Sequence, residues 1–331
     1  MENKLLGEPD ARQHANNLRL LAALPHGASI EKRERIVDYD IVELAALLRE
    51  GNPEKLTSEQ LFMAYWNRIL QFNGPEETYG NNGKYNAFVR LEDFSTLLKQ
   101  AILADQWLTT PDDERGPAPP LCGIPFGIKD SFALQGLESK NGTQAFSGNL
   151  ALRDATCVAR LRAQGAIIIG HTICSELSTH TVGQFAGNAW DPTRTPGGSS
   201  QGSGVAPVAR LCAAALGEET AGSIIIPAAA NGASAIKPSL GLVSGAGVMP
   251  LRSGWDVVGP IDRRAALHYP YPRLCSSGRA DHRHSADGLD VFARPTTCAV
   301  LRSGLRRCLH QVQRSACSAG CQGHRLSLAG C

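Results

Sequence analysis

The chain has 331 residues, of which 43% are hydrophobic and 19% charged, and its formal net charge is +2. This composition can fill a sizeable core, and it excludes a disordered chain, a disulfide-stabilised mini-protein and a coiled coil. No apolar run reaches the ~18 residues of a transmembrane helix, and the first residues lack the apolar core of a signal peptide. We therefore expect a cytoplasmic protein that has no membrane partner.

The basic residues are concentrated at one end of the chain. Residues 264–331 hold 10 Arg, no Lys, no Glu and 3 Asp, together with 5 of the 9 His and 6 of the 10 Cys. Residues 1–263 hold the remaining 23 basic and 28 acidic side chains, so they are net acidic. The small positive net charge is thus the sum of two unlike segments and does not indicate nucleic-acid binding by the whole chain.

Residues 264–331 allow three interpretations. Their arginines could bind nucleic acid, although few aromatic residues accompany them. Their Cys and His residues could bind a metal ion, but the only tight Cys pair, Cys317 and Cys321, has no second pair to match it. We favour the third interpretation, a shifted reading frame or a retained intron, and predict no metal site, no nucleic-acid partner and no place in the fold for this segment.

The first half of the chain reads as helices joined by polar loops. Asp40 can cap a helix that ends at Arg49, and Thr57 with Gln60 matches a capping box at the start of a second helix. Apolar spacing then predicts the remaining elements of this half. They are a strand at Asn86–Val89, a helix at Phe94–Trp107 and a surface linker at Pro111–Pro120.

The second half alternates apolar strands with helices. The pattern predicts strands at Ile124–Ile128 and Ala166–Gly170, and helices at Ala155–Ala163 and Val205–Leu216. Such alternation is typical of an α/β fold whose sheet is largely covered by helices.

The segment Pro196–Gly204, PGGSSQGSG, is the first candidate for chemistry. It could cradle a phosphate, although it lacks the Lys of a P-loop. It also fits the G-x-S-x-G nucleophile elbow with Ser200 as nucleophile, but every later His lies in residues 264–331. Taken alone, a flexible Gly/Ser turn is the simplest interpretation.

Two further segments carry candidate residues. Gly217–Pro227 places Ser223 in a turn of small residues, where successive backbone N–H groups could form an anion nest. Gly123–Asp130 ends an apolar strand on Lys129. Burial disfavours the charged form of lysine, and a neutral amine can accept a serine proton. The alternative is that Lys129 pairs with Asp130 or with another carboxylate.

Together these segments resemble the amidase-signature enzymes. The resemblance spans roughly residues 40–263, and it is carried by the stretches GIPFGIKD, GNAWDPTRTPGGSSQGSG, GEETAGSIIIPAAANG and VMPLRSGWDVVGPIDR. It implies an α/β fold with a mixed β-sheet core covered by helices. It also implies hydrolysis of a small-molecule carboxamide to an acid and ammonia or an amine, without a cofactor. The oligomeric state stays open.

The resemblance also implies a role for individual residues. Ser223 corresponds to the nucleophile, Ser199 to the bridging serine beside a cis peptide bond, and Lys129 to the base. Gly198 and Ser200 then support the loop. The backbone N–H groups that would form the oxyanion hole belong to Thr220, Ala221, Gly222 and Ser223.

The sequence departs from the family pattern in three respects. Ala221 stands where Gly or Asp is usual. Ile225 stands where many members carry an Arg that pairs with an acid, while Glu219 holds the position of the acid. The family pattern also stops after Arg263, so we expect a truncated domain whose C-terminal part is missing or replaced.

The end of the family pattern after Arg263 leads us to predict three segments in the chain. Residues 1–122 form an N-terminal helical region and linker, residues 123–263 the catalytic core, and residues 264–331 an atypical tail. The alternative to an active amidase is a catalytically inactive, truncated homologue.

Overall fold

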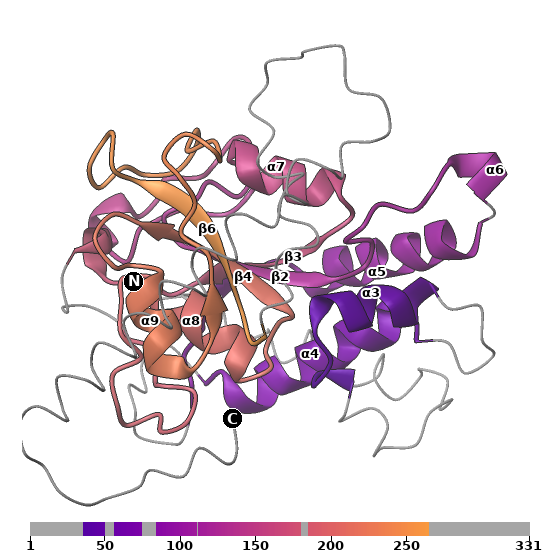
Figure 1. The fold of residues 1–331 in the computed structure, drawn as a ribbon, viewed down its shortest axis with the longest axis horizontal. Coiled ribbons are helices and arrows are strands. Elements are labelled where there is room, and N and C mark those ends of the chain that lie inside the picture. The colour runs from indigo at the N-terminus through magenta and orange to yellow at the C-terminus, as the bar shows by residue number, and fades with distance from the viewer. Residues whose placement is uncertain (1–35, 50–55, 75–83, 111, 180–184, 265–331) are drawn as a thin grey trace, which may run out of the picture. The chain divides into compact units, whose positions relative to one another are not determined.

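The fold is that of a computed structural model, which describes residues 36–49, 56–74, 84–110, 112–179 and 185–264 (Figure 1). The predictions for residues 265–331, including those for metal and nucleic-acid binding, lie outside the described residues. The helices and 3-10 turns are α3 (Ile41–Arg49), α4 (Ser58–Phe72), α5 (Phe94–Thr109), α6 (Asp112–Arg115), η1 (Gln144–Phe146), α7 (Thr156–Ala163), η2 (Glu176–Ser178), α8 (Gln201–Val208) and α9 (Ile225–Asn231).

A mixed sheet of six strands forms the centre of the described part. The strands are β1 (Phe88–Leu91), β2 (Pro125–Lys129), β3 (Ile167–Thr172), β4 (Ala214–Glu219), β5 (Ser234–Ala235) and β6 (Val257–Asp262). Their order is β1-β3-β2-β4-β6-β5. Strands β3, β2 and β4 are parallel to one another, and the other pairings are antiparallel. This confirms the predicted α/β fold with a mixed sheet.

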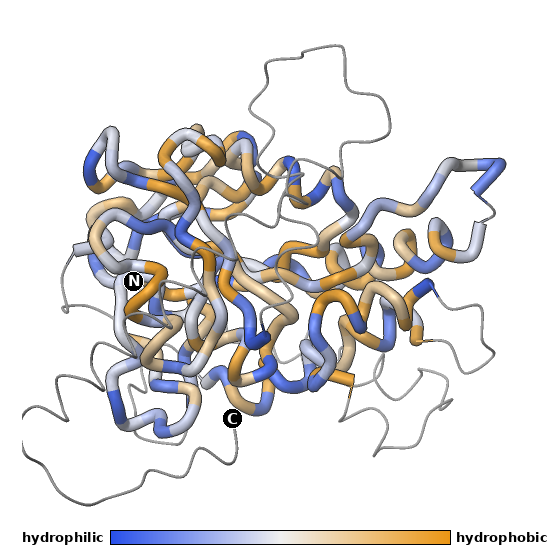
Figure 2. The backbone as a smooth tube through the Cα atoms, viewed as in Figure 1, coloured by the Kyte–Doolittle hydropathy of each residue, from blue (hydrophilic) through white to orange (hydrophobic). Residues whose placement is uncertain are grey.

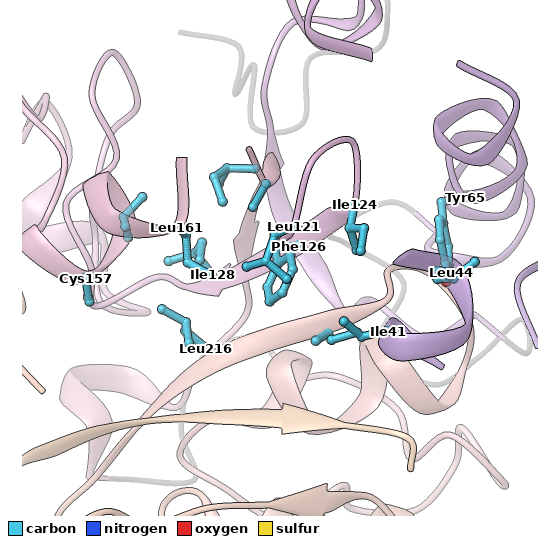
Figure 3. Close-up of a cluster of buried hydrophobic side chains, with 14 of the residues drawn as sticks. Ile41, Leu44, Tyr65, Leu121, Ile124, Phe126, Ile128, Cys157, Leu161 and Leu216 are labelled. Atoms are coloured by element: carbon cyan, nitrogen blue, oxygen red, sulfur yellow. The ribbon is translucent and has the colours of Figure 1, made fainter. Parts of the chain in front are cut away.

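The sheet is packed on both faces. On one face Phe126, Ile128 and Leu216 belong to the same buried apolar cluster as side chains of α3 and α7 (Figure 3). On the other face Ile169 and Ala215 contact α8, which lies beside β4 in Figure 1. Figure 2 shows apolar residues along the strands and alternating with hydrophilic residues along the helices, as is typical of elements that bury one face.

The predicted caps are present at the first two helices. Asp40 precedes α3, and its carboxylate accepts the backbone N–H groups of Val42 and Glu43 in the first turn of that helix. Thr57 and Gln60 form the reciprocal capping box of α4, with the Gln60 N–H donated to Thr57 Oγ1 over 3.1 Å. The linker predicted at Pro111–Pro120 contains one exposed turn, α6.

One predicted element is wrong. The sequence indicates a helix at Val205–Leu216, but α8 ends at Val208 and the chain enters β4 at Ala214. Arg210 adopts a positive φ of 60° and closes the turn between the two elements. A run of small apolar residues is compatible with both a buried helix and a buried strand, so periodicity alone does not separate them.

Candidate active site

The inner parallel strands deliver Lys129 to the centre of the candidate site. Lys129 is the last residue of β2, and its side chain is 0% exposed. Its Nζ lies 2.7 Å from Ser199 Oγ, 2.9 Å from Glu218 Oε2 and 3.4 Å from the Glu218 carbonyl oxygen. Glu218 lies near the end of the neighbouring strand β4, and its side chain is 1% exposed. The carboxyl ends of parallel strands meet at one edge of the sheet, where α/β folds commonly place their sites.

Asp130 does not pair with Lys129. Its carboxylate is paired with Arg90 and accepts the backbone N–H groups of Lys140 at 3.2 Å and Gly142 at 3.0 Å. The buried His171 lies beside this cluster. Burial, and secondly the charge of Arg90, lower the pKa of His171 to about 3, so its ring is neutral at pH 7. The structure therefore combines both sequence interpretations of Lys129, a carboxylate partner and a serine neighbour.

The Gly/Ser segment presents Ser199 to Lys129. The peptide bond between Gly198 and Ser199 is cis, as the resemblance implies. The Ser199 carbonyl oxygen accepts the Ser175 N–H over 3.0 Å, and Gln201 Nε2 donates to Ser175 Oγ over the same distance. These bonds hold Ser199 and the following Gln201 against Ser175.

Ser223 lies in the turn between β4 and α9. Its carbonyl oxygen accepts the Ser200 N–H over 3.1 Å, which ties this turn to the Gly/Ser segment. Ser223 is 8% exposed, and within the described residues its hydroxyl has no hydrogen-bond partner. No hydrogen bond joins it to Ser199 in this structure. The turn thus leaves the Ser223 hydroxyl without a partner among the described residues, while the backbone of Ser223 is bonded to Ser200, the residue after Ser199.

Ser200 is enclosed by protein. It is 0% exposed, its Oγ donates to the Glu218 carbonyl oxygen over 3.2 Å, and the Glu218 N–H lies 3.3 Å from the same Oγ. A hydroxyl held in this way cannot reach a substrate, which argues against the nucleophile-elbow interpretation and for a supporting role.

The Glu219 carboxylate organises the turn that holds Ser223. It accepts the backbone N–H groups of Gly222, of Ile224 at 2.5 Å and of Ile225 at 3.2 Å. Glu219 thereby caps the start of α9 in place of an acid–arginine pair. The Gly222 N–H is consequently occupied and not free to bind an oxyanion.

Three of the four expected oxyanion donors remain open. Among the described residues, the backbone N–H groups of Thr220, Ala221 and Ser223 have no partner. The Thr220 side chain makes a further contact, because its hydroxyl oxygen lies 2.8 Å from Glu218 Oε1 and 2.5 Å from Asp256 Oδ1.

Glu218 and Asp256 are the site neighbours that the sequence does not single out. Two consecutive glutamates at the end of an apolar strand are the available signal, since a carboxylate is rarely buried without a partner. The partner cannot be read from spacing, because Lys129 and Glu218 are 89 positions apart.

In the part of the chain that the structure describes, no group of three or more His, Cys, Asp and Glu residues is placed to hold a metal ion. No helix of this part has the length and apolar character needed to cross a membrane.

Comparison with known proteins identifies the relatives of this chain. The family model described as Amidase matches residues 77–284. The glutamyl-tRNA(Gln) amidotransferase subunit of Methylobacillus flagellatus is 36% identical over 235 residues, which cover 70% of this chain and 44% of that protein. The chain therefore spans less than half the length of this relative.

Solved structures give the same result for the fold. The native peptide amidase of Stenotrophomonas maltophilia is 32% identical, with a TM-score of 0.58 over 70% of this chain and 46% of that one. An amidase family protein from Bacillus anthracis is 27% identical, with a TM-score of 0.61 over 79% of this chain and 51% of that one.

Proposed function

The chain belongs to the amidase family, and on that premise we propose that it is an amidase, which hydrolyses a small-molecule carboxamide to a carboxylic acid and ammonia or an amine. The observation that carries the proposal is the buried contact of 2.7 Å between Lys129 Nζ and Ser199 Oγ, next to a turn that presents Ser223. A cytoplasmic location without a membrane partner is part of the same proposal.

In the proposed reaction Ser223 Oγ attacks the amide carbon. The Ser223 proton passes to Ser199, whose own proton passes to Lys129, and the reverse transfer protonates the leaving amine. The resulting acyl-enzyme on Ser223 is then hydrolysed by water. No step in this sequence needs a cofactor.

The negative oxygen of the tetrahedral intermediate requires nearby donors. The open N–H groups of Thr220, Ala221 and Ser223 support this role. Gly222 is left out, because its N–H is donated to the Glu219 carboxylate. Removing one such donor typically costs about 10²–10³ in rate, so two or three donors are a substantial contribution.

The second candidate is a catalytically inactive homologue. The observation that favours it is the lack of a hydrogen bond between the hydroxyls of Ser199 and Ser223 in this structure. Catalytic hydrogen bonds are often longer before substrate binds, so this geometry is compatible with both candidates.

A serine-directed fluorophosphonate probe separates the two candidates. We expect the full chain to be labelled, and peptide mapping by mass spectrometry to find the adduct on Ser223. Heat-unfolded protein is the control for nonspecific reaction. Failure of the folded chain to react, with no turnover of aryl, fatty or peptide amides, would favour the inactive homologue.

A further inference from the structure

A line of polar groups leads from Lys129 to a cavity. Lys129 Nζ lies 2.9 Å from Glu218 Oε2, and Glu218 Oε1 lies 2.8 Å from Thr220 Oγ1. Thr220 Oγ1 in turn lies 2.5 Å from Asp256 Oδ1. Glu218 and Asp256 both line a cavity of about 170 Å³. These contacts restrict where the protons can reside.

The Thr220 hydroxyl carries one proton but lies between two carboxyl oxygens. A hydroxyl can donate only one hydrogen bond, so only one of the two oxygens can accept from it. Asp256 accepts the backbone N–H groups of Leu251 at 3.0 Å and Arg252 at 2.9 Å, and such bonds favour the ionised carboxylate. Thr220 therefore donates to Asp256, and its second close contact requires a proton on Glu218 Oε1.

The neighbours of Lys129 fit the same assignment. A neutral amine has two N–H groups and one lone pair. The two N–H groups can be donated to Glu218 Oε2 and to the Glu218 carbonyl oxygen, while the lone pair accepts the Ser199 hydroxyl proton. In the charged form all three contacts must be donated, which leaves no lone pair for Ser199.

We propose that Glu218 is a positioning residue that holds the proton of Lys129, so that the pair consists of a neutral carboxylic acid and a neutral amine. Relative to the ion pair, Lys129 has one N–H bond fewer and Glu218 has one O–H bond more, at Oε1; this proton reaches Oε1 by exchange through the cavity and not directly from Lys129, whose Nζ contacts Oε2. The net charge of the pair stays zero. Two buried ions become two neutral hydrogen-bonded groups, which removes a desolvation cost that the ion pair carries. The proposal rests on the proposed function of Lys129 as the base.

The other ionisable groups around the pair are already engaged or neutral. Cys174 is buried near the pair, and burial raises the pKa of its thiol to about 11. Asp130 is paired with Arg90, and the Glu219 carboxylate is bonded to the turn before α9. Asp256 is thus the carboxylate nearest to Glu218 in this line, and the shared cavity gives the proton a route of exchange with solvent.

Infrared difference spectroscopy tests the proton on Glu218 directly. We expect the spectrum of the unmodified chain minus that of Glu218→Gln to contain the carbonyl stretch of a protonated carboxylic acid, and this band should shift in D₂O. A carboxylate band in its place would overturn the proposal. Asp262→Asn is the matched control, because Asp262 is a second buried carboxyl. The band assigned to Glu218 should persist in the spectrum of Asp262→Asn and be absent from that of Glu218→Gln. This readout requires no turnover, so it decides the proposal even if the amidase function fails.

The pH dependence of kcat/KM provides the second test. Gln resembles a protonated Glu, so in Glu218→Gln we expect kcat to fall only a few-fold and the acidic midpoint to stay within about half a pH unit. Thr220→Val removes the acceptor of the Glu218 proton, so we expect the acidic midpoint of kcat/KM to rise by about one pH unit in this variant. The same exchange made in Glu218→Gln should leave the midpoint unchanged, because the proton in question is no longer there. A midpoint that falls by about one unit in Glu218→Gln would show that Glu218 is ionised and Lys129 charged, contrary to the proposal.

Discussion

Ser199, Ser200 and Ser223 lie together at the candidate site, and exchanging them one at a time separates their roles. We expect Ser223→Ala to abolish amide hydrolysis and probe labelling, because the attacking oxygen is lost. Ser200→Ala is the matched exchange and should keep measurable turnover. It removes a buried hydroxyl bonded to Glu218, so a loss of stability of about 1 kcal/mol is expected instead. Equal loss of activity in both variants would contradict the choice of nucleophile.

Lys129 is the second position where one substitution is informative. Lys129→Met keeps most of the side-chain volume but removes the base, so we expect kcat/KM to fall by about 10²–10⁴. Rising pH should restore part of the rate, because hydroxide can replace the missing base. The pH–rate profile of the variant measures this, with circular dichroism to confirm that it is folded. Unchanged activity would remove Lys129 from the mechanism.

Residues whose partners are distant in sequence could not be predicted from the sequence. Lys129, Ser199 and Ser223 could be proposed because each lies in a recognisable segment of a known family pattern. Glu218 could not, because its partner lies on a neighbouring strand far away in sequence. The occupied Gly222 N–H likewise depends on how the Glu219 side chain folds back onto its own turn.

Elements with a clear period or a cap could be predicted closely. The capping box at Thr57 fixes the start of α4, and the predicted strand at Ala166–Gly170 corresponds to β3 (Ile167–Thr172). The predicted helix at Val205–Leu216 could not be separated into the end of α8 and the start of β4 from the sequence, because its small residues fit both a buried helix and a buried strand. β4 was missed there, together with the contact it makes to Lys129.

The start of α8 leaves no room for a side chain at Gly202. A Cβ atom at Gly202 would lie 2.0 Å from the Ala87 carbonyl oxygen and 2.7 Å from the Ile173 backbone nitrogen. Because both are backbone atoms, we expect Gly202→Ala to displace α8 from the sheet and to destabilise the fold by about 1–3 kcal/mol. Urea unfolding measures this free energy.

Gly245→Ala is the control for this packing prediction. Gly245 is exposed, and a Cβ atom there would meet nothing within 4 Å. Its change in stability should stay within about 0.5 kcal/mol. Equal stability of the two variants would show that α8 can move away from β1 and β3 at little cost.

At the scale of the whole molecule, the N-terminal helices and the inner strands share one core. Ile41 and Leu44 of α3 belong to the same buried cluster as Phe126 and Leu216 (Figure 3). Strand β1, which lies within the predicted segment of residues 1–122, also pairs with β3 of the predicted catalytic core. The division into residues 1–122, 123–263 and 264–331 stays a prediction about roles, because the first two segments pack together.

The stability of the whole molecule should depend on pH through Asp262, at the end of β6. Burial, and secondly the charge of Asp40, raise the pKa of this carboxyl to about 8 from an ordinary value of 3.8, although the Arg264 backbone N–H and the charge of Arg263 oppose the shift. Between about pH 4 and pH 8 the unfolded chain therefore loses a proton that the folded chain keeps. The unfolded state binds fewer protons, so this group makes the free energy of unfolding fall as pH rises through that window.

Asp262→Asn should remove this contribution, since an amide does not ionise. We expect the variant and the unmodified chain to be similar in stability near pH 4, and the variant to be more stable by up to about 5 kcal/mol at pH 8, because each pH unit of this window contributes about 1.4 kcal/mol. Urea unfolding at several pH values measures the difference, in which the other titrating groups cancel. Asp113→Asn, an exposed carboxylate of α6, should show no such trend. A constant difference between Asp262→Asn and the unmodified chain across this range would mean that Asp262 is ionised in the folded protein and that Arg263 or solvent compensates its charge.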